Sequence, residues 1–353
     1  GWTVERDTGY HLAALMPFVE MAEAYEAAGV PVFDERFKRL FDAPLAYSTD
    51  LKAPGFGPGY LTAYEHYRDP LYRRTVAAAR REPVPAPEGG FTNSVLRATG
   101  YTVLRAGEDD ASLRTVSMNW GCPAHRGGKI LLDPKATWKG LPLNEHVYRI
   151  AYGYKQSGFS YTAAAGNSLV VDGKASSMLR ADQVALVGGP MPAARWVSPL
   201  HRPLYPGVRW ARTAALCGDT FLLVDQITAD RPHRFDLFSF LPHDLLGCVP
   251  AETAWKEIPE FASQGSGYDF FQDPQAADAA VTGLDYRLDA KDPKPRGRLT
   301  LLGADGARVM RMRGFIRWHP VLVPVVARRL EGERTAWFVA AFTGRTGEDA
   351  PLP

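Results

Sequence analysis

Two short stretches of the chain combine residues that can exchange protons with residues that can attract anions. The first is the pair Tyr10 and His11 near the start of the chain. The second is His125, which is followed closely by the bases Arg126 and Lys129. A phenol or an imidazole held within hydrogen-bond reach of a substrate can donate or accept a proton. Tyr10 and His125 are therefore the candidate catalytic residues.

Each of these residues also has a structural explanation, which the sequence leaves open. Most tyrosines are packing residues, so Tyr10 could be an aromatic in the wall of a helical layer. His11 could contact a substrate or cap the start of a helix, and His125 could belong to an ordinary loop. Arg126 and Lys129 could attract carboxylates or lie in a solvated turn.

The elements that carry the first stretch are helices. Apolar residues recur with helical spacing up to about residue 81. Residues 10–28 predict a long helix with two apolar stripes, which we expect to be packed on two sides. Pro17 means that this helix either begins close to Leu15 or is kinked, and Pro44 is predicted to end the next helix. The first stripe comprises Leu12, Leu15, Met16, Val19 and Ala22, and the second comprises Phe18, Met21 and Tyr25.

The second stretch lies in a region of strands. After a linker rich in proline and glycine at residues 83–90, the apolar period changes to two. Short strand-like runs continue to the end of the chain without alternating helices, which predicts an antiparallel sandwich over residues 91–353. Gly303-Ala-Asp-Gly306, between two such runs, predicts a hairpin.

The bulk composition is that of a turn-rich globular protein with room for two domains. The chain has 353 residues and a formal net charge of +2, from 41 basic and 39 acidic residues. This balance gives no whole-protein field to attract nucleic acid or an anionic membrane. No run approaches the roughly 18–20 apolar residues of a membrane span, and the three cysteines show no metal-binding spacing. We expect neither nucleic acid nor a membrane as a partner.

Several motifs, taken in their order along the chain, resemble those of a known family. Glu5-Arg-Asp-Thr-Gly-Tyr10-His11, which leads into the helix with two apolar stripes, resembles the segment that carries the catalytic tyrosine of heparinase II/III-like polysaccharide lyases. The stretch that contains Ala165-Gly-Asn-Ser resembles the family strand with the pattern HNTVVVDG. The resemblance covers residues 1–245. The other matching stretches are residues 100–105, 212–225 and 233–236.

The resemblance implies an α/α toroid followed by a large antiparallel β-sandwich. About 80 residues are too few for a complete toroid, so we expect an α+β protein in two parts. Residues 1–82 would be the closing helices of the toroid, and residues 91–353 the β-sandwich. The remaining toroid helices would come from an upstream segment or chain, because the opening Gly-Trp-Thr-Val-Glu is typical of the middle of a domain.

The activity that the resemblance implies is β-elimination at C4 of a uronic acid. A base removes the proton at C5, an acid protonates O4, and a third group neutralises the carboxylate beside C5. One phenol can perform the first two tasks, and the resemblance gives that role to Tyr10. His125 would neutralise the carboxylate or orient the base. The implied partner is an anionic polysaccharide met outside the cytoplasm, so we expect a secreted or periplasmic protein.

Further residues are expected to hold the substrate at the junction of the two parts. Aromatic side chains can stack on sugar rings, and arginines can pair with carboxylates. Arg97 or Arg105 is a candidate for such a pair. The residues that we expect to bind substrate are His11, Trp120, Arg126, Lys129 and Tyr154.

The sequence departs from the family at the positions that hold a structural zinc in many relatives. Their pattern is His-x-His-x-Asp, a later Asp, and a His before an Asn-Thr pair. Here the second and the last of these histidines correspond to Gly127 and Gly166, and His146 lies near the later Asp. At most two potential ligands remain, so we predict no zinc and no other cofactor.

Two other functions stay open. A non-catalytic carbohydrate-binding β-sandwich is favoured by the loss of the His-x-His pattern and by the small number of helices. Glycoside hydrolysis needs two carboxylates that flank the bond. Glu5, Asp7 and Glu65 lie in the helical part, but nothing in the sequence pairs them. Alginate, heparin-like and hyaluronan-like chains all fit the lyase hypothesis.

Overall fold

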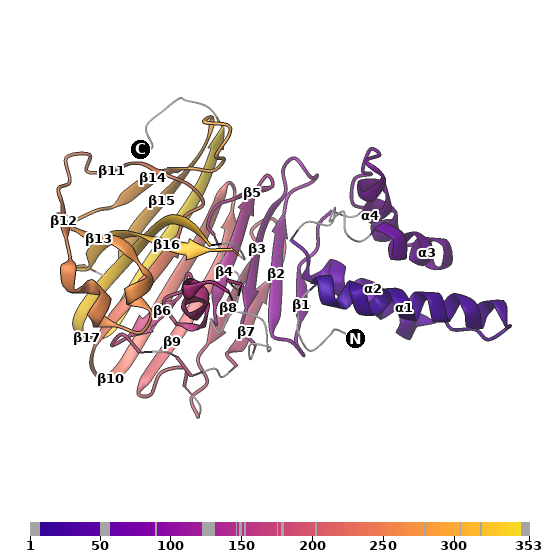
Figure 1. Cartoon of the computed structure of the whole chain (residues 1–353), viewed down its shortest axis with the longest axis horizontal. Helices are drawn as coiled ribbons and strands as arrows, with labels where there is room; N and C mark the ends of the chain where they lie inside the picture. The colour runs from indigo at the N-terminus through magenta and orange to yellow at the C-terminus, as the bar shows by residue number, and fades with distance from the viewer. Residues whose placement is uncertain are drawn as a thin grey trace.

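The computed structural model has a small helical part followed by a large antiparallel β-part (Figure 1). The helices are α1 (Thr8–Ala27), α2 (Glu35–Tyr47), α3 (Gly57–Tyr67) and α4 (Pro70–Arg80). The predicted linker lies between α4 and the first strand. No helix in the described part of the chain is long and apolar enough to cross a membrane. The structure describes residues 8–49, 57–88, 90–121, 131–145, 147, 150–151, 153–174, 176–177, 180–201, 203–278, 280–303, 305–317 and 320–346.

α2 begins at a side-chain cap and continues past its predicted end. Asp34 Oδ1 accepts hydrogen bonds from the backbone N–H groups of Arg36 and Phe37, both at 2.9 Å, and so satisfies two donors of the first turn. Pro44 lies inside the helix, so the prediction that it ends the helix is wrong. A proline removes its own N–H, which in this helix would have bonded to the carbonyl of Leu40. That carbonyl has another donor, described below.

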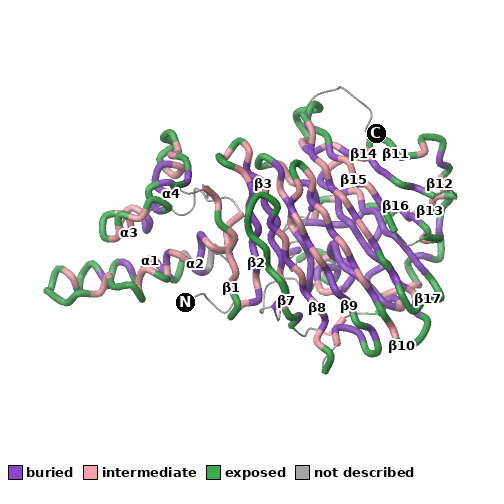
Figure 2. Tube along the Cα trace, turned by 180° about the vertical axis from the view of Figure 1, so that it is seen from behind, coloured by how far each residue is buried: buried purple, intermediate pink, exposed green. Residues whose placement is uncertain are grey.

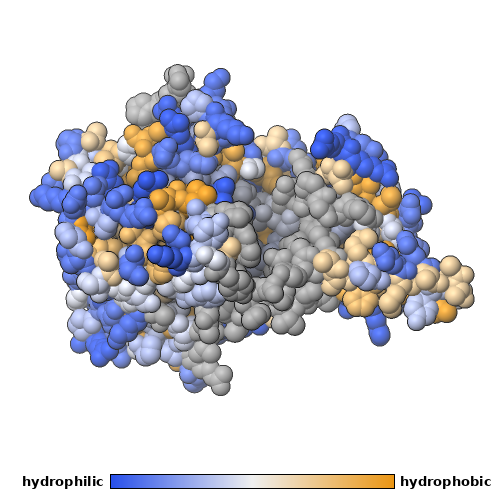
Figure 3. Space-filling view, in the orientation of Figure 1, coloured by the Kyte–Doolittle hydropathy of each residue, from blue (hydrophilic) through white to orange (hydrophobic). Residues whose placement is uncertain are grey.

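α1 is buried along one of its two predicted stripes. The helix begins at Thr8 and continues through Pro17, so the alternative start near Leu15 is wrong. Figure 3 shows apolar surface where α1 lies. The helix is therefore covered on one side and uncovered on the other within the described part of the chain. Buried residues of the first stripe are Leu15, Val19 and Ala22, whereas Phe18, Met21 and Tyr25 of the second are 53%, 53% and 52% exposed.

The first five strands of the β-part form one antiparallel sheet, which we call the five-stranded sheet. Their order in the sheet is their order along the chain, as expected for strands joined by successive turns. The strands are β1 (Ser94–Leu96), β2 (Tyr101–Ala106), β3 (Arg114–Asn119), β4 (Asp133–Trp138) and β5 (Leu141–Pro142).

The remaining twelve strands form a second antiparallel sheet, the large sheet. Its main path runs β11-β14-β15-β17-β10-β9-β8-β7, with β12, β13, β16 and β6 attached at the side. The strands are β6 (Leu169–Val171), β7 (Asp182–Val187), β8 (Ala193–Val197), β9 (Val208–Cys217), β10 (Thr220–Phe240), β11 (Leu245–Val249), β12 (Trp255–Glu257), β13 (Gln272–Ala277), β14 (Gly283–Arg287), β15 (Pro295–Gly303), β16 (Arg308–Ile316) and β17 (Val321–Thr346).

The two longest strands, β10 and β17, pair with each other and organise the large sheet. Along its other edge β17 pairs with β16 over its first half and with β15 over its second half. Within the described residues β15 and β16 share no pairing, so the hairpin predicted at residues 303–306 is wrong. Both strands pair with the same long neighbour, and the turn carries the chain from one half of β17 to the other.

The five-stranded sheet packs on one face of the large sheet, which makes the β-part a sandwich. Their shared core cluster includes Val116 and Met118 from the smaller sheet and Trp210 and Phe342 from the larger one. A second cluster lies under the other half of β10 and β17, and a third lies among the helices. Seen from behind, the large sheet has no helix over its outer face (Figure 2). The predicted α+β class with a β-sandwich is confirmed.

Candidate functional site

The first turns of α1 are held to α2 by the imidazole of His11. Its Nε2–H donates to the carbonyl of Leu40 at 2.8 Å, the carbonyl that Pro44 leaves without a helical donor. His11 is 4% exposed, and burial lowers its pKa although the bond to Leu40 opposes that shift. Neutral His11 thus fixes the helical segment that carries Tyr10. The side chain of Tyr10 lies outside the described residues, and its catalytic role stays a prediction, as does a substrate contact of His11.

Arg105 of β2 joins the helical part to the five-stranded sheet. Its Nη2 donates to the carbonyls of Leu45 and Ser48 at 3.2 and 2.6 Å, at the end of α2. Its Nη1 donates to the hydroxyl of Ser94 at 2.7 Å. A cation is favoured at a helix C-terminus by the helix dipole, and burial lowers the pKa of Arg105 to about 10. Arg105 therefore positions the helices, in place of the substrate contact that the sequence suggested.

The end of α2 also meets the start of β2. Tyr47, the last residue of the helix, stacks on Tyr101 with ring centroids 4.0 Å apart. Directly before β2, Gly100 has a φ of +69°, and a Cβ on it would lie 2.2 Å from Cα of Gly121. Only a residue without a side chain permits this close approach. The two glycines bring the ends of β2 and β3 together beside the helix.

Residues 122–130 lie outside the described part of the chain, but both ends of this segment are fixed. Gly121 donates its N–H to the carbonyl of Gly100, and Leu132 donates to Asn119 at 2.8 Å. Asn119 pairs with Tyr101 in the sheet, so both ends lie beside the contact with α2. The predicted residues of this segment are His125, Arg126 and Lys129, and their roles stay predictions.

Trp120 lies in the core between the two sheets. It is 2% exposed, and its indole Nε1–H donates to the hydroxyl of Thr102 at 2.9 Å. That hydroxyl donates to Oε1 of Gln183, also at 2.9 Å. The guanidinium of Arg180 lies over the ring, 4.5 Å from its centroid. The structure gives Trp120 a packing role, and its contact with a sugar stays a prediction.

Tyr154 lies in a different region from the other described site residues. It is 39% exposed and precedes the short helix η2 (Lys155–Tyr161), whose Phe159 belongs to the second core cluster. The helices η3 (Pro259–Gln264) and η4 (Tyr268–Phe270) contribute to the same cluster. Tyr154 is thus held by the half of the β-part away from Trp120. Its contact with substrate stays a prediction.

A buried ion pair supports the candidate site from behind, and the sequence analysis missed it. Arg212 of β9 and Asp225 of β10 are both 0% exposed. Nε and Nη2 of Arg212 bond to the two carboxylate oxygens at 2.7 and 2.9 Å. Nη1 donates to the carbonyls of Leu132 and Asn167, and so ties the end of the segment 122–130 to the large sheet. A paired Arg and Asp among apolar strand residues was the available signal.

Asn167 uses both atoms of its side-chain amide in buried hydrogen bonds. Nδ2 donates to Oδ1 of Asp133 at 2.9 Å and to the carbonyl of Glu145 at 2.6 Å. Oδ1 accepts from the N–H of Phe240 at 2.7 Å. Among the residues that the structure describes, no group of three or more acidic, His or Cys side chains could hold a metal. His146 lies outside them, so the absence of a zinc stays a prediction.

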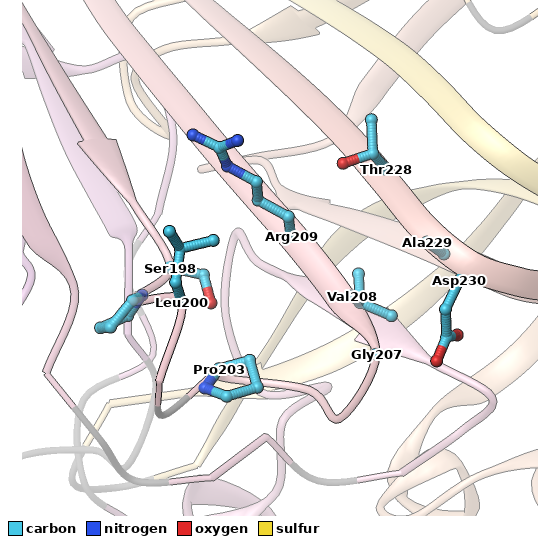
Figure 4. A pocket seen from close by; sticks show the side chains of 10 residues that line it. Ser198, Leu200, Pro203, Gly207, Val208, Arg209, Thr228, Ala229 and Asp230 are labelled. Carbon is cyan, nitrogen blue, oxygen red and sulfur yellow. The ribbon is translucent and has the colours of Figure 1, made fainter.

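A pocket of about 310 Å³ opens on the outer face of the large sheet (Figure 4). Arg209 of β9 and Thr228 of β10 lie on neighbouring strands of its wall, and Asp230 lies at one end. The five-stranded sheet packs on the opposite face. None of the predicted site residues with a described side chain lines this pocket.

Comparison with known proteins gives a match at the level of structure. No protein-family model matches the sequence, and no curated protein matches it. Heparan sulfate lyase HepC from Pedobacter heparinus superposes on 99% of this chain with a TM-score of 0.74 and 12% sequence identity. A heparinase III structure superposes on 98% of the chain with a TM-score of 0.73 and 12% identity. The chain has the heparinase III fold.

The heparinase III fold includes both parts of the chain in one superposition. A second heparinase III structure, with 13% identity and a TM-score of 0.73, matches 100% of the chain. The resemblance that the motifs of the sequence indicated is thus confirmed for the fold. The chain spans about half the length of these structures, between 54% and 55%. The likeness does not extend to the role of any residue.

Proposed function

We propose that this chain forms part of a polysaccharide lyase that cleaves a uronic-acid-containing polysaccharide by β-elimination. The superposition on heparan sulfate lyase HepC over 99% of the chain carries the proposal. It includes the helices and the five-stranded sheet together. A second support is the buried contact of α2 with β2, because the helix and the strand ends beside it lead to the two stretches of candidate catalytic residues.

In the proposed mechanism Tyr10 serves as both base and acid. Its phenolate oxygen accepts the proton from C5, and the C4–O4 bond breaks as the double bond between C4 and C5 forms. The same oxygen returns a proton to the departing O4. His125 neutralises the carboxylate beside C5, so that charge can spread onto it in the transition state. His11, Trp120, Arg126, Lys129 and Tyr154 are the proposed contacts to the rest of the polymer.

We further propose that the four described helices belong to an incomplete α/α toroid. The exposed stripe of α1 supports this idea, because Phe18, Met21 and Tyr25 are each about half exposed on one side of one helix. A helix that is apolar on two sides is usually covered on two sides. Further helices, from an upstream segment or another chain, would cover this stripe. A polymeric substrate also favours a secreted or periplasmic protein.

The test of the catalytic role is Tyr10→Phe in the protein that contains this chain. Elimination creates a conjugated double bond, so turnover of heparan sulfate, alginate and hyaluronan is followed by ultraviolet absorbance. Loss of the phenol should reduce kcat by at least about a hundredfold, since a general acid and base is removed. Tyr25→Phe is the matched control, because it removes a hydroxyl from an exposed tyrosine of the same helix.

The two functions give different outcomes in this assay. Full activity of Tyr10→Phe contradicts the role of Tyr10 while leaving the lyase proposal intact. Binding of a polymer by the wild-type protein without any unsaturated product supports the alternative, a non-catalytic carbohydrate-binding β-sandwich. Equal loss of activity in Tyr25→Phe shows that the loss comes from the helix and not from the chemistry.

A further inference from the structure

The outer face of the large sheet carries a row of arginines on three adjacent strands. In the register of β14, β15 and β17, Arg287 lies opposite Arg296, and Arg296 lies opposite Arg345. The preceding residue of the first strand, Tyr286, is 0% exposed in the core. Successive side chains of a strand point to opposite faces, so Arg287 and its two partners point outward. We call these three residues the arginine row.

The arginine row is unfavourable unless an anion neutralises it. Like charges directly opposite each other on a sheet repel, which destabilises the pairing. Within the described part of the chain, the side chains of Arg287 and Arg296 form no ion pair. Asp285, on the same face, lies 3.9 Å from Nε of Arg298 in the next register position. The row therefore presents guanidinium groups that can form bidentate bonds with carboxylates or sulfates.

A second feature of the same face suits a sugar ring. Trp337 of β17 is 55% exposed, an unusual state for so large an aromatic side chain. Gln226 lies directly opposite it on β10, and Arg195 donates from Nη2 to the Oε1 of Gln226. An exposed indole can stack on the apolar face of a sugar, while planar polar groups beside it bond to hydroxyls.

The arginine row and Trp337 lie on one line along β17. Trp337 and Arg345 are separated by an even number of residues, so they share the outward face. Eight residues of strand span about 27 Å. A small anion or a single sugar can reach only one of the two features, whereas an extended polymer can reach both. The pocket at Arg209 and Thr228 continues the line beyond Gln226.

We propose that the outer face of the large sheet is a second binding surface for an anionic polysaccharide, separate from the predicted catalytic site. The arginine row binds carboxylates or sulfates, and Trp337 with Gln226 and Arg195 binds a sugar ring. The five-stranded sheet covers the opposite face of the large sheet, so this surface holds polymer away from the junction with the helices. The ligand class rests on the proposed function, but the surface itself requires no catalysis.

The test compares two double variants with the same loss of charge. Arg287→Gln with Arg296→Gln removes two members of the row, and Arg308→Gln with Arg313→Gln removes two exposed arginines of β16. Binding to immobilised heparan sulfate and hyaluronan is measured at low and high salt. The first variant should bind roughly tenfold more weakly at low salt and show a shallower salt dependence, because two ionic contacts are lost. The second should bind like the wild type.

Trp337→Ala separates stacking from charge. It should weaken binding of the polymer while leaving its salt dependence unchanged, since no charge is removed. Wild-type binding by the row variant, or equal losses in both double variants, overturns the proposal. Selective loss of single-stranded DNA or phosphatidylserine vesicles, with no polysaccharide bound by the wild type, also overturns it by identifying another polyanion.

Failure of the lyase proposal is distinguishable from failure of this one. Turnover of a short uronate oligosaccharide should be the same for the row variant and the wild type, because the oligosaccharide cannot span the surface. A protein that forms no unsaturated product, yet loses polysaccharide binding only in the row variant and Trp337→Ala, supports the second surface and rejects the lyase. Normal elimination with unchanged polymer binding in all variants rejects the surface alone.

Discussion

The helical part and the β-part differ in how completely they cover their own apolar residues. The β-part encloses two large core clusters, and its bulkiest side chains, such as Trp196 and Trp210, are 0% and 1% exposed. The helical part has one small cluster around Phe41 and Tyr60, and leaves a stripe of α1 open. The β-part is a complete sandwich, whereas the helical part presents a face that suits another helical layer.

The same contrast holds for buried polar groups. The β-part buries charges in full pairs, as between Arg212 and Asp225 and between Arg329 and Asp236. The helical part is fixed to it mainly by Arg105, which binds the end of α2. The candidate catalytic residues are therefore divided between a rigid side and an incomplete side. Mutations on the two sides should differ in what they change.

The largest expected effect is on the rigid side. Arg212→Leu leaves Asp225 buried without its partner and should lower the free energy of unfolding by about 3–5 kcal/mol, because an unpaired buried charge is strongly disfavoured. The free energy is measured by urea denaturation. Arg209→Leu, an exposed arginine of the same strand, should stay within about 0.5 kcal/mol of the wild type.

A double variant shows whether charge or shape is responsible. Arg212→Leu with Asp225→Leu removes both charges, so it should recover part of the stability that the single variant loses. A double variant that is as unstable as the single one would indicate that the bonds from Arg212 to Leu132 and Asn167 matter more than the charge pair. Either result identifies what holds the end of the segment 122–130.

The next effect compares the two stripes of α1. Leu15→Ala empties a buried site and should cost about 2–5 kcal/mol, while Phe18→Ala, at 53% exposure, should cost about 0.5 kcal/mol or less. Both are measured by chemical denaturation with helical circular dichroism as the signal. In a protein with further toroid helices, Phe18→Ala should become as costly as Leu15→Ala. Equal costs in this chain alone contradict an open stripe.

The order of elements could be predicted from the sequence because periodicity records burial locally. The change from helical spacing to a period of two lies between α4 and β1, where the structure changes from helices to strands. The partners of the strands could not be predicted in the same way. Residues 303–306 have the residues of a hairpin, but β17 offers both flanking strands a longer edge than they offer each other. Pairing across a long sequence distance decided the topology.

The candidate site shows the same limit. The types of Tyr10, His11 and His125 suggested chemistry, and the resemblance gave them roles, but their mutual geometry depends on contacts distant in sequence. Pro44 was read as a helix end, because a proline lacks the N–H that continues a helix. The structure satisfies the carbonyl of Leu40 from another helix instead. A donor 29 residues away carries no local signal.

The smallest expected effect tests this contact between helices through pH. The folded-state pKa of His11 lies below its model value of 6.5, so the unfolded chain binds its proton more readily. Stability from the neutral imidazole is therefore fully present above pH 6.5 and is lost as the pH falls from 6.5 towards the folded pKa. His11→Ala should lose about 1–2 kcal/mol at neutral pH together with this part of the pH dependence. His201→Ala, an exposed histidine, should keep both.

Pro44→Ala addresses the same bond from its other side. An alanine restores the N–H that bonds to the carbonyl of Leu40 within α2, so His11 must share its acceptor. The helix gains a bond and propensity while the contact between helices weakens, so the net stability should change by less than about 1 kcal/mol. The pH dependence attributed to His11 should nevertheless shrink, as urea midpoints on both sides of pH 6.5 would show. An unchanged pH dependence would mean that the proline does not provide the site for His11, and that α1 is held by its buried stripe alone.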